Sequence, residues 1–355
     1  MSRGSDGAKR ARPPRAARRR GRSLLGTLLV LLAVGALIAA GAAWTAWRWV
    51  DRPLPLAAPA VALTVAPGST PRAIAQGWAD AGVTTDPRWL FAWFRLSGDA
   101  PRIRAGHYEV GPGITPRRLL EIMVLGLETL ERLRLPEGQT LREWRALLAA
   151  SPHLKPDSAA LDERALMAAM GAPGLRAEGR FFPDTYAFPR GTSDLVVLQR
   201  AFDAMQRHLD TVWAERAPGL PLASPDEALI LASIIEKETG REDERALVAG
   251  VFVNRLRIGM RLQTDPTIIY GLGEAFDGRL RRVHLDTDGP FNTYTRAGLP
   301  PTPITMPSLA SLRAAVQPAD TRAMYFVARG DGTSHFSETL AEHNRAVNRY
   351  QRGQR

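Results

Sequence analysis

An uncharged stretch near the amino terminus most constrains what this chain can fold into. Residues 24–44 form a run of about 21 residues without a charged side chain. A helix of that length spans the hydrocarbon core of a bilayer, which is roughly 30 Å thick. We therefore predict a transmembrane helix at residues 23–44 and a stalk rich in Pro and Ala at 45–60.

Positive charge is concentrated on one side of this run. Residues 1–22 contain nine Lys or Arg and a single acid, and so carry most of the formal net charge of +11. By the positive-inside rule this basic tail stays in the cytoplasm, and everything after about residue 50 is exported. Trp44, Trp47 and Trp49 then lie where an interfacial aromatic belt is expected.

Other interpretations of the amino terminus stay open. Residues 40–42 (Ala-Gly-Ala) resemble a signal-peptide cleavage site, although the apolar run is longer than a usual signal core. A twin-arginine export signal at 18–25 is a weaker alternative. The absence of cysteine fits an exported domain without disulfides but decides nothing alone. Nucleic-acid binding by the basic tail is not predicted, because an apolar run follows it directly.

The region 61–150 repeats a pattern of strand, turn and Thr-capped helix about three times. Alternating strands are expected at 61–65, 106–110 and 130–135, with helices beginning near Thr70, Thr115 and Thr140. A further helix after Asp86 carries Trp89, Leu90, Trp93 and Phe94 at helical spacing. Such a stripe is more typical of core packing than of sugar stacking. We predict one small α+β module at 61–150.

The rest of the chain is expected to be mainly helical, so the predicted fold class is α+β. Residues 151–175 are interpreted as a helical connector, and an aromatic-rich turn at 178–186 opens a second domain at 176–355. Helices dominate until a segment rich in Gly and Pro at 271–307. A final strand at 324–328, a turn at 329–332 and a polar helix close the chain.

One apolar helix contains two carboxylates and marks the candidate site. Residues 224–227 (Ser-Pro-Asp-Glu) form a capping-box start, and Gly240 supplies the stop. Periodicity predicts burial nearly all round, with only Ser233 and Lys237 pointing away. A carboxyl group among aliphatic side chains is harder to ionise, so it can hold a proton near neutral pH as a general acid must.

Periodicity alone does not choose between the two acids. Glu238 lies nearer the centre of the apolar face, and Glu236 lies at its border. The alternative without catalysis is that one or both are buried ion-pair partners of Arg255, Arg257 or Arg261.

The second half of the chain resembles the endolytic murein transglycosylase (YceG-like) family over roughly residues 175–350. The resemblance rests on ordered motifs: ASIIEKET at 232–239, VFVNRL at 251–256, MRLQTDP at 260–266, IYG at 269–271, FNTY at 291–294 and GLPP at 298–301. Three positions depart from the family pattern, namely Arg180, Thr302 and Ser308, where the family more often has an apolar or aromatic residue, Gly and Gly. We expect these departures to affect the rim of the cleft but not the acid.

This resemblance implies a function. The module at 61–150 would be a LysM-like peptidoglycan-binding region. The domain at 176–355 would cleave the β-1,4 bond between N-acetylmuramic acid and N-acetylglucosamine within nascent glycan strands, leaving 1,6-anhydromuramic ends and terminating elongation. The first Glu of the Glu-Lys-Glu run, Glu236, would be the catalytic acid.

It also implies a place and partners. Together with the predicted anchor and its charge bias, it indicates a single-pass protein of the inner membrane with its catalytic domain in the periplasm. Its partners would be peptidoglycan strands and the synthases that make them.

Substrate contacts are expected from polar and aromatic residues near this acid. They are Glu238, Gln263, Asp265, Tyr270, Asn292 and Tyr294. Each also has a structural alternative, since Asp265-Pro266 is a common helix start and Asn292 and Tyr294 are suited to bracing a loop. His284, His335 and His343 are too scattered for a zinc motif, so neither a metal nor a cofactor is predicted.

Two other functions remain alternatives at this point. A muramidase-type hydrolase would use Glu236 as acid and Asp265 as the second carboxylate. A membrane-tethered scaffold would bind peptidoglycan without cleaving it.

Overall fold

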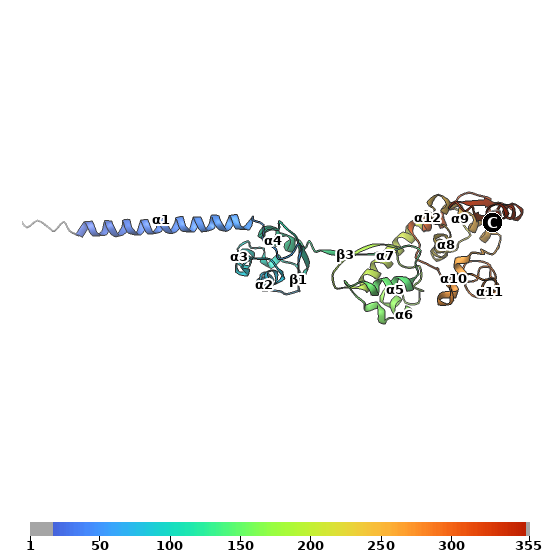
Figure 1. Ribbon diagram of the computed structural model, residues 1–355, viewed down its shortest axis with the longest axis horizontal. Helices are drawn as coiled ribbons and strands as arrows, with labels where there is room; N and C mark the ends of the chain where they lie inside the picture. The colour runs from blue at the N-terminus through green and yellow to red at the C-terminus, as the bar shows by residue number, and fades with distance from the viewer. Residues whose placement is uncertain (1–16, 353–355) are drawn as a thin grey trace, which may run out of the picture. The chain divides into compact units, whose positions relative to one another are not determined.

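The computed structural model describes residues 17–352 (Figure 1). The chain divides into two compact units, with the boundary between Thr129 and Leu130. The fold mixes helices and small two-stranded sheets, in agreement with the predicted α+β class.

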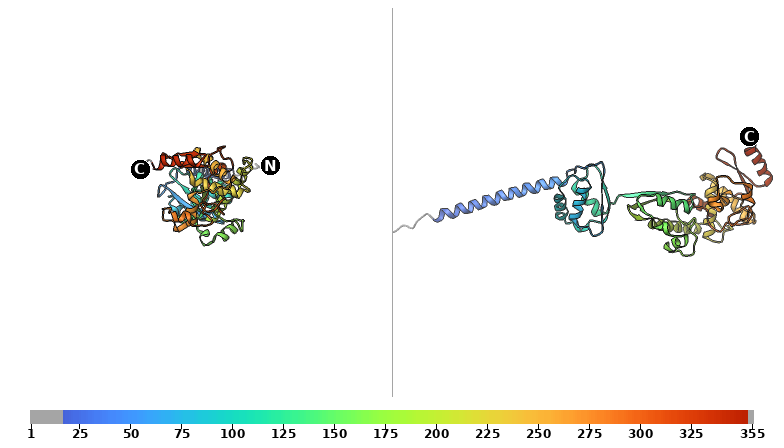
Figure 2. Two further views of the ribbon diagram at one scale, coloured as in Figure 1. Left: turned by 90° about the vertical axis from the view of Figure 1, so that its right-hand side faces the viewer. Right: turned by 60° about the horizontal axis from the view of Figure 1, so that its bottom comes forward.

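The amino-terminal helix α1 (Ala17–Val50) is one unbroken rod (Figure 2). Its part from Gly26 to Val50 is long and apolar enough to cross a membrane. Large apolar side chains along it, such as Leu31 and Leu37, are exposed. Since water is an unfavourable solvent for such a surface, the helix is suited to a lipid environment.

The predicted stalk at 45–60 is not a free linker. Helix α1 continues to Val50. Leu54 then packs into the first unit and its N–H donates to the Ile114 carbonyl at 2.7 Å. The difference from the prediction arises because Leu54 and Leu56 supply apolar side chains that the neighbouring core buries.

The first unit is built on two antiparallel strands, with Val61 opposite Val110 and Val65 opposite Gly106. Threonine or aspartate caps with Pro at the first helical position begin its three main helices, as predicted. The elements are β1 (Val61–Val65), α2 (Pro71–Ala81), α3 (Pro87–Leu96), the 3-10 turn η1 (Ala100–Arg102), β2 (Gly106–Val110) and α4 (Pro116–Leu125).

The core of this unit contains part of the predicted aromatic stripe. Leu90 and Phe94 are fully buried beside Trp78. Trp93 is partly buried, and its indole N–H donates to the Pro116 carbonyl at 3.1 Å. The prediction of core packing is wrong for Trp89, which is 58% exposed.

The third strand of the predicted repeat belongs to the second unit. Strand β3 (Leu130–Leu135) pairs antiparallel with β5 (Asp184–Pro189), so residues 130–150 fold with the chain that follows them. The aromatic-rich turn expected at 178–186 therefore ends in a strand. Other elements of this part are α5 (Leu141–Ala150), β4 (Leu154–Lys155), η2 (Asp157–Ala160), α6 (Glu163–Ala169) and β6 (Thr192–Ser193).

Residues 151–175, expected to be a connector, contribute to a core. Leu166 and Met167 of α6 are fully buried with Trp144 of α5 and Phe181. The segment is therefore part of the second unit rather than a spacer before it.

Helices form the remainder of the second unit. They are α7 (Asp194–Ala214), α8 (Pro225–Glu238), α9 (Glu242–Arg257), α10 (Asp265–Leu272), η3 (Gly273–Ala275), α11 (Arg282–Asp286) and α12 (Leu309–Val316). The predicted final strand is β7 (Tyr325–Ala328), which pairs with a strand that was not predicted, β8 (Ser334–Ser337). Helix α13 (Leu340–Val347) and the π-helical turn η4 (Asn348–Arg352) follow.

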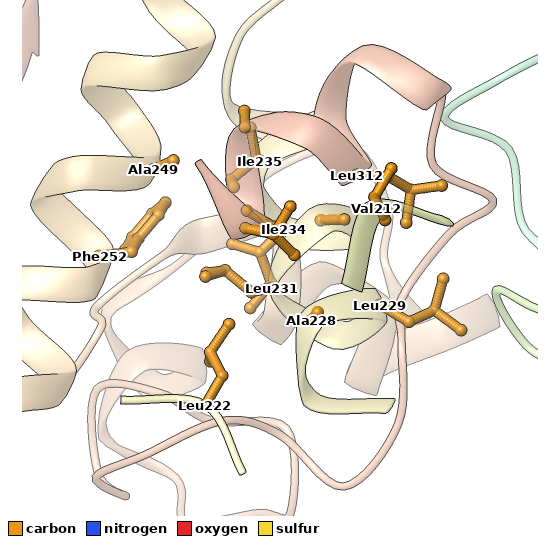
Figure 3. Close-up of a cluster of buried hydrophobic side chains, with 14 of the residues drawn as sticks. Val212, Leu222, Ala228, Leu229, Leu231, Ile234, Ile235, Ala249, Phe252 and Leu312 are labelled. Atoms are coloured by element: carbon orange, nitrogen blue, oxygen red, sulfur yellow. The ribbon is translucent and has the colours of Figure 1, made fainter. Parts of the chain in front are cut away.

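Helix α8 lies at the centre of its core (Figure 3). Leu229, Leu231, Ile234 and Ile235 are fully buried. Burial of each such side chain contributes about 1.5–3 kcal/mol, which fixes the rotation of the helix. The expectation that Ser233 points to solvent is wrong, because this residue is fully buried and its hydroxyl donates to the Ile230 carbonyl at 2.7 Å.

Candidate active site

The local sequence fixes where α8 begins and where it ends. The Ser224 hydroxyl accepts the Glu227 N–H, while the Glu227 carboxylate accepts the N–H of Ala223. The helix ends at Glu238 with Thr239 as its C-cap, one residue before the predicted stop at Gly240. Both candidate acids therefore lie in its last turn.

Glu236 is held by the start of helix α12. Its side chain is only 5% exposed. Oε2 accepts the Ser308 N–H at 2.9 Å and the Ser308 hydroxyl at 2.5 Å, and Arg245 Nη2 lies 3.9 Å from Oε1. Two donors and a cation are the surroundings that stabilise a carboxylate.

These contacts correct two expectations. The cation near Glu236 is Arg245, not Arg255, Arg257 or Arg261. The view that a departure at Ser308 leaves the acid untouched is also wrong, because α12 begins against the end of α8 and brings this hydroxyl onto the carboxylate.

Two loop segments are fixed beside Glu236. The Gly138 N–H donates to the Met306 carbonyl, and the Met306 N–H donates to the Gln139 carbonyl, each at 2.9 Å. Lys237 Nζ donates to the Gly138 carbonyl at 3.2 Å. A Cβ on Gly138 would lie 3.9 Å from Glu236 Cγ, so this glycine borders the acid directly.

A cavity of about 630 Å³ opens next to these segments. Its walls come from α5, α8 and α10 and from the Pro-rich segment, and include Gly138, Thr140, Arg142, Glu143, Glu178, Lys237, Ile269, Tyr270, Ile304 and Thr305. Of the predicted contact residues, this cavity contains Tyr270. Its ring packs edge-on against Phe291, with 4.9 Å between centroids.

Glu178 is a buried acid in this cavity. It is 8% exposed and accepts the Leu141 N–H at 3.0 Å and the Tyr270 hydroxyl at 3.3 Å. Burial raises the pKa of Glu178 to about 7, although these donors oppose the rise. The next residue must be Gly179, since its φ is +79° and a Cβ there would lie 2.4 Å from Pro303 Cβ.

A second cavity of about 660 Å³ brings together four other predicted residues, Glu238, Gln263, Asp265 and Tyr294. The Tyr294 hydroxyl donates to Asp265 Oδ1 at 2.6 Å. Burial raises the pKa of Glu238, while a hydrogen bond from the Thr264 hydroxyl works in the opposite direction.

Gln263 in this cavity has an unusual backbone. Within residues 17–352 it is the single non-glycine residue with positive φ, at 50°. Such conformations cost free energy and cluster at functional sites.

Asn292 braces a loop. It is buried, and its Nδ2 donates to the carbonyls of His284, Leu285 and Thr287. Its Oδ1 accepts the Tyr294 N–H at 2.9 Å. The side-chain contacts of Asn292 are therefore those of a residue that braces a loop, which was the structural alternative to substrate binding.

The last turn of α8 contributes to both cavities. Lys237 lines the first cavity and Glu238 lines the second, and Glu236 directly precedes Lys237 in the chain. The carboxyl group of Glu236 itself is turned toward Ser308. One helical turn thus contributes a residue to each of the two cavities.

Comparison with known proteins identifies the family. The model of the YceG-like family matches residues 63–349. The chain belongs to the YceG-like family. This match covers most of both folded units, so the family assignment extends beyond the region in which the sequence motifs lie.

Relatives of this YceG-like chain have names that describe an activity. A Bacillus subtilis protein called endolytic murein transglycosylase is 36% identical over 174 residues, which cover 49% of this chain and 48% of the relative. A Streptococcus pneumoniae protein of the same name is 32% identical over 178 residues, which cover 48% of this chain and 32% of the relative. The chain therefore spans about half and about a third of the length of these two proteins.

A solved structure supports the fold. The crystal structure of a yceG-like protein from Listeria monocytogenes superposes with a TM-score of 0.52 at 29% identity. The match covers 81% of this chain and 98% of the Listeria chain.

The other two departures from the family pattern have structural roles. Arg180 is buried, and its Nη1 lies 2.7 Å from Asp226 in the first turn of α8. The Thr302 hydroxyl donates to the Pro303 carbonyl at 3.0 Å. Arg180 therefore ties the turn after Glu178 to the start of the helix that carries Glu236.

Sequence reasoning missed three residues of this YceG-like site. They are Glu178, Arg245 and Ser308. Glu178 left one usable signal, because it is an acid directly before a glycine in an aromatic-rich turn. Arg245 left none, and Ser308 stood out only as a departure from the family pattern, because the contacts of both with Glu236 depend on how α9 and α12 pack on α8.

Proposed function

We propose that this YceG-like chain is a membrane-anchored endolytic lytic transglycosylase. Its substrate is the β-1,4 bond between N-acetylmuramic acid and N-acetylglucosamine within peptidoglycan strands, and its product carries a 1,6-anhydromuramic end. The observation that carries the proposal is Glu236, an acid of the family's Glu-Lys-Glu motif that borders Gly138 in the wall of the first cavity. The names of the relatives support it.

Glu236 acts first as an acid. Protonated Glu236 gives its proton to the glycosidic oxygen, and the bond between that oxygen and C1 of the muramyl sugar breaks. Because the side chain is 5% exposed and bonded to Ser308, it must rotate toward the glycan for this step. Gly138, which lacks a side chain next to Glu236 Cγ, leaves room for that rotation.

Glu236 acts next as a base. The carboxylate takes the proton of the C6 hydroxyl on the same sugar, and O6 forms a bond to C1. No water is consumed, and the acid is regenerated. An attached nucleophile replaces a bimolecular step, so a second carboxylate is not required.

Ser308 and Arg245 have a role between these two steps. The carboxylate left after proton donation accepts the Ser308 N–H and hydroxyl and lies near the Arg245 guanidinium. A hydroxyl can also accept a hydrogen bond, so Ser308 can remain a partner when Glu236 is protonated.

The two cavities bind the glycan, and the last turn of α8 contributes Lys237 to the first and Glu238 to the second. Their volumes of about 630 and 660 Å³ lie in the range of roughly 300–1,000 Å³ that is typical of ligand sites. Tyr270 contacts the sugar in the first cavity. The sugar in the second cavity is bound by hydrogen bonds and ring contacts from Glu238, Gln263, Asp265 and Tyr294. Asn292 acts indirectly, by holding the backbone of Tyr294.

The remaining parts of the chain place the enzyme near new wall. The apolar helix α1 anchors it in the inner membrane with the basic tail in the cytoplasm. The first unit is a LysM-like module that holds peptidoglycan, and it ends near Thr129 rather than at residue 150. Synthases supply the nascent strands, and cleavage ends their elongation.

The substitution Glu236→Gln tests this proposal. The variant keeps the size of the side chain and removes the carboxyl proton that the reaction requires. Digestion of purified glycan strands by the wild type should give anhydromuramic ends, and the variant should give none. Cleavage by the variant at the wild-type rate would show that Glu236 is not the acid.

A further inference from the structure

We propose that Glu178 is a second ionisable residue of this site, whose carboxylate accepts hydrogen bonds from the amide or hydroxyl groups of a sugar bound in the first cavity. The proposal rests on the function given above, because that function supplies the ligand. It adds a binding residue, and a dependence on pH, to a site otherwise built around Glu236.

The contacts of Glu178 leave acceptor capacity free. A carboxylate has about four acceptor positions. The Leu141 N–H lies 3.0 and 3.2 Å from the two oxygens, the Tyr270 hydroxyl lies 3.3 Å from Oε2, and the Gly179 N–H is a third donor. The Leu141 N–H is shared between the two oxygens, so three donors serve about four positions, and Glu178 lines the cavity.

Capping of α5 does not require this acid. Helix α5 already has a complete capping box, formed by Thr140 and Glu143. Glutamine at 178 would still accept the Leu141 N–H through its one oxygen, without the cost of burying a charge, but only a carboxylate offers two acceptor oxygens to the groups around it. The chain nevertheless has a carboxyl group here, 8% exposed and facing a cavity.

The cavity connects Glu178 to the acid of the reaction. Gly138 and Lys237 both line it, and Gly138 borders Glu236 Cγ. A sugar in this cavity therefore lies beside the bond on which Glu236 acts.

Other charged groups near Glu178 are accounted for. Helix α5 contributes Arg142, which pairs with Glu274, and Glu143, which caps at Thr140. Helix α8 contributes Lys237, which bonds the Gly138 carbonyl, and α6 contributes Glu163, whose charge slightly opposes ionisation of Glu178. The described lining of the cavity includes no histidine, so Glu178 is the group that changes charge near neutral pH.

The direction of the pH effect follows from the chemistry. Above a pH of about 7 Glu178 is a carboxylate and accepts hydrogen bonds from the sugar. Below it, the added proton occupies an acceptor position and removes the charge. If only the carboxylate binds, affinity falls about tenfold between pH 8 and pH 6.

Binding without cleavage tests this inference. The probe is a peptide-free oligomer of alternating N-acetylglucosamine and N-acetylmuramic acid. The protein is the full chain in detergent with Glu236→Gln, so that the probe survives, and affinity is measured by titration calorimetry at pH 6, 7 and 8. We expect the tenfold loss at pH 6 with Glu178 present, and uniformly weak binding at every pH after Glu178→Gln.

Two further variants complete the design. Glu178→Asp keeps a carboxyl group and should keep a pH step, which also shows that the position tolerates change. Glu163→Gln alters an acid that accepts the Ala177 N–H but does not line the cavity, and should leave the step in place. A tenfold step that survives Glu178→Gln, or no step in its presence, would overturn the inference.

The outcome is separable from that of the proposed function. If the wild type makes no anhydromuramic ends while the pH step in binding is present, the reaction is wrong and the assignment of Glu178 stands. If the anhydromuramic ends form and the pH step in binding is absent, the proposed reaction stands and the assignment of Glu178 is wrong.

Discussion

Ser308 holds Glu236 by two hydrogen bonds to the same carboxylate oxygen, from its N–H at 2.9 Å and from its hydroxyl at 2.5 Å. Ser308 is also the N-cap of α12, and its hydroxyl oxygen accepts the Ser311 N–H at 3.3 Å. The start of one helix and the acid at the end of another are therefore one connected unit.

Two substitutions separate the cap from the catalytic contact. Both variants lose the bond to Glu236, and Ser308→Ala should lower the free energy of unfolding by roughly 0.5–1 kcal/mol more than Ser308→Gly, because Gly is the better N-cap. Both remove the hydroxyl from Glu236, so both should reduce kcat by about tenfold. Denaturant unfolding and steady-state cleavage measure the two effects. Wild-type kcat in the Gly variant would show that the hydroxyl does not support the acid.

Arg245 should contribute to turnover through Glu236. Arg245→Gln removes the cation 3.9 Å from Oε1, and we expect kcat to fall on the order of tenfold, which is about 1.4 kcal/mol in the barrier. The matched control is Arg241→Gln, which removes a surface pair with Asp243. Exposed pairs of this kind contribute about 0–1 kcal/mol to stability, so the control should keep its kcat. Equal losses in both variants would contradict a specific role for Arg245.

Local signals predicted much of the fold. Thr70, Thr115 and Thr140 begin helices, because a hydroxyl cap followed by a helical pattern depends on a few neighbouring residues. Strand partners depend on distant residues. The pairing of β3 with β5 could not be predicted, and it moved residues 130–150 into the second unit.

The candidate site was predictable only where a reactive type of side chain stands out within a predicted helix or in the sequence just after it. Glu236 and Glu238 stood out as acids in an apolar run. Gln263, Asp265 and Tyr294 were expected contacts because they are polar or aromatic residues in loop-like sequence after that helix, and the structure brings them into one cavity with Glu238. The prediction for Ser233 was wrong because the periodicity of one helix does not show which distant segment covers it. The segment that does so contains Ile304, whose N–H donates to the Ser233 hydroxyl oxygen.

The buried carboxyl of Glu178 should also affect stability. Its pKa rises from an ordinary 4.5 to about 7 on folding, so the folded state binds the proton more tightly. The resulting stabilisation amounts to about 3 kcal/mol. It is complete below pH 4.5 and is lost as the pH rises to about 7.

The check compares the free energy of unfolding at pH 5 and pH 8. Glu178→Gln should show a smaller decrease than the wild type over this interval, while Glu242→Gln, which replaces an exposed acid of α9, should match the wild type. An unchanged decrease in Glu178→Gln would mean that this carboxyl is not the group that titrates.

The orientation in the membrane can be measured cleanly, because the chain contains no cysteine. Single substitutions Ser5→Cys, in the basic tail, and Asp320→Cys, at an exposed position of the second unit, provide unique labels. A maleimide that cannot cross the inner membrane should label position 320 in intact spheroplasts and position 5 only after lysis. The opposite pattern would contradict a cytoplasmic amino terminus.

Mass spectrometry of the products from purified glycan strands tests the central claim most directly. Wild type, Glu236→Gln and the control Glu242→Gln, an exposed acid in the next helix, are compared side by side. We predict 1,6-anhydromuramic ends from the wild type and from the control, and intact strands from Glu236→Gln. Reducing muramic ends from the wild type, or anhydromuramic ends from Glu236→Gln, would contradict the account.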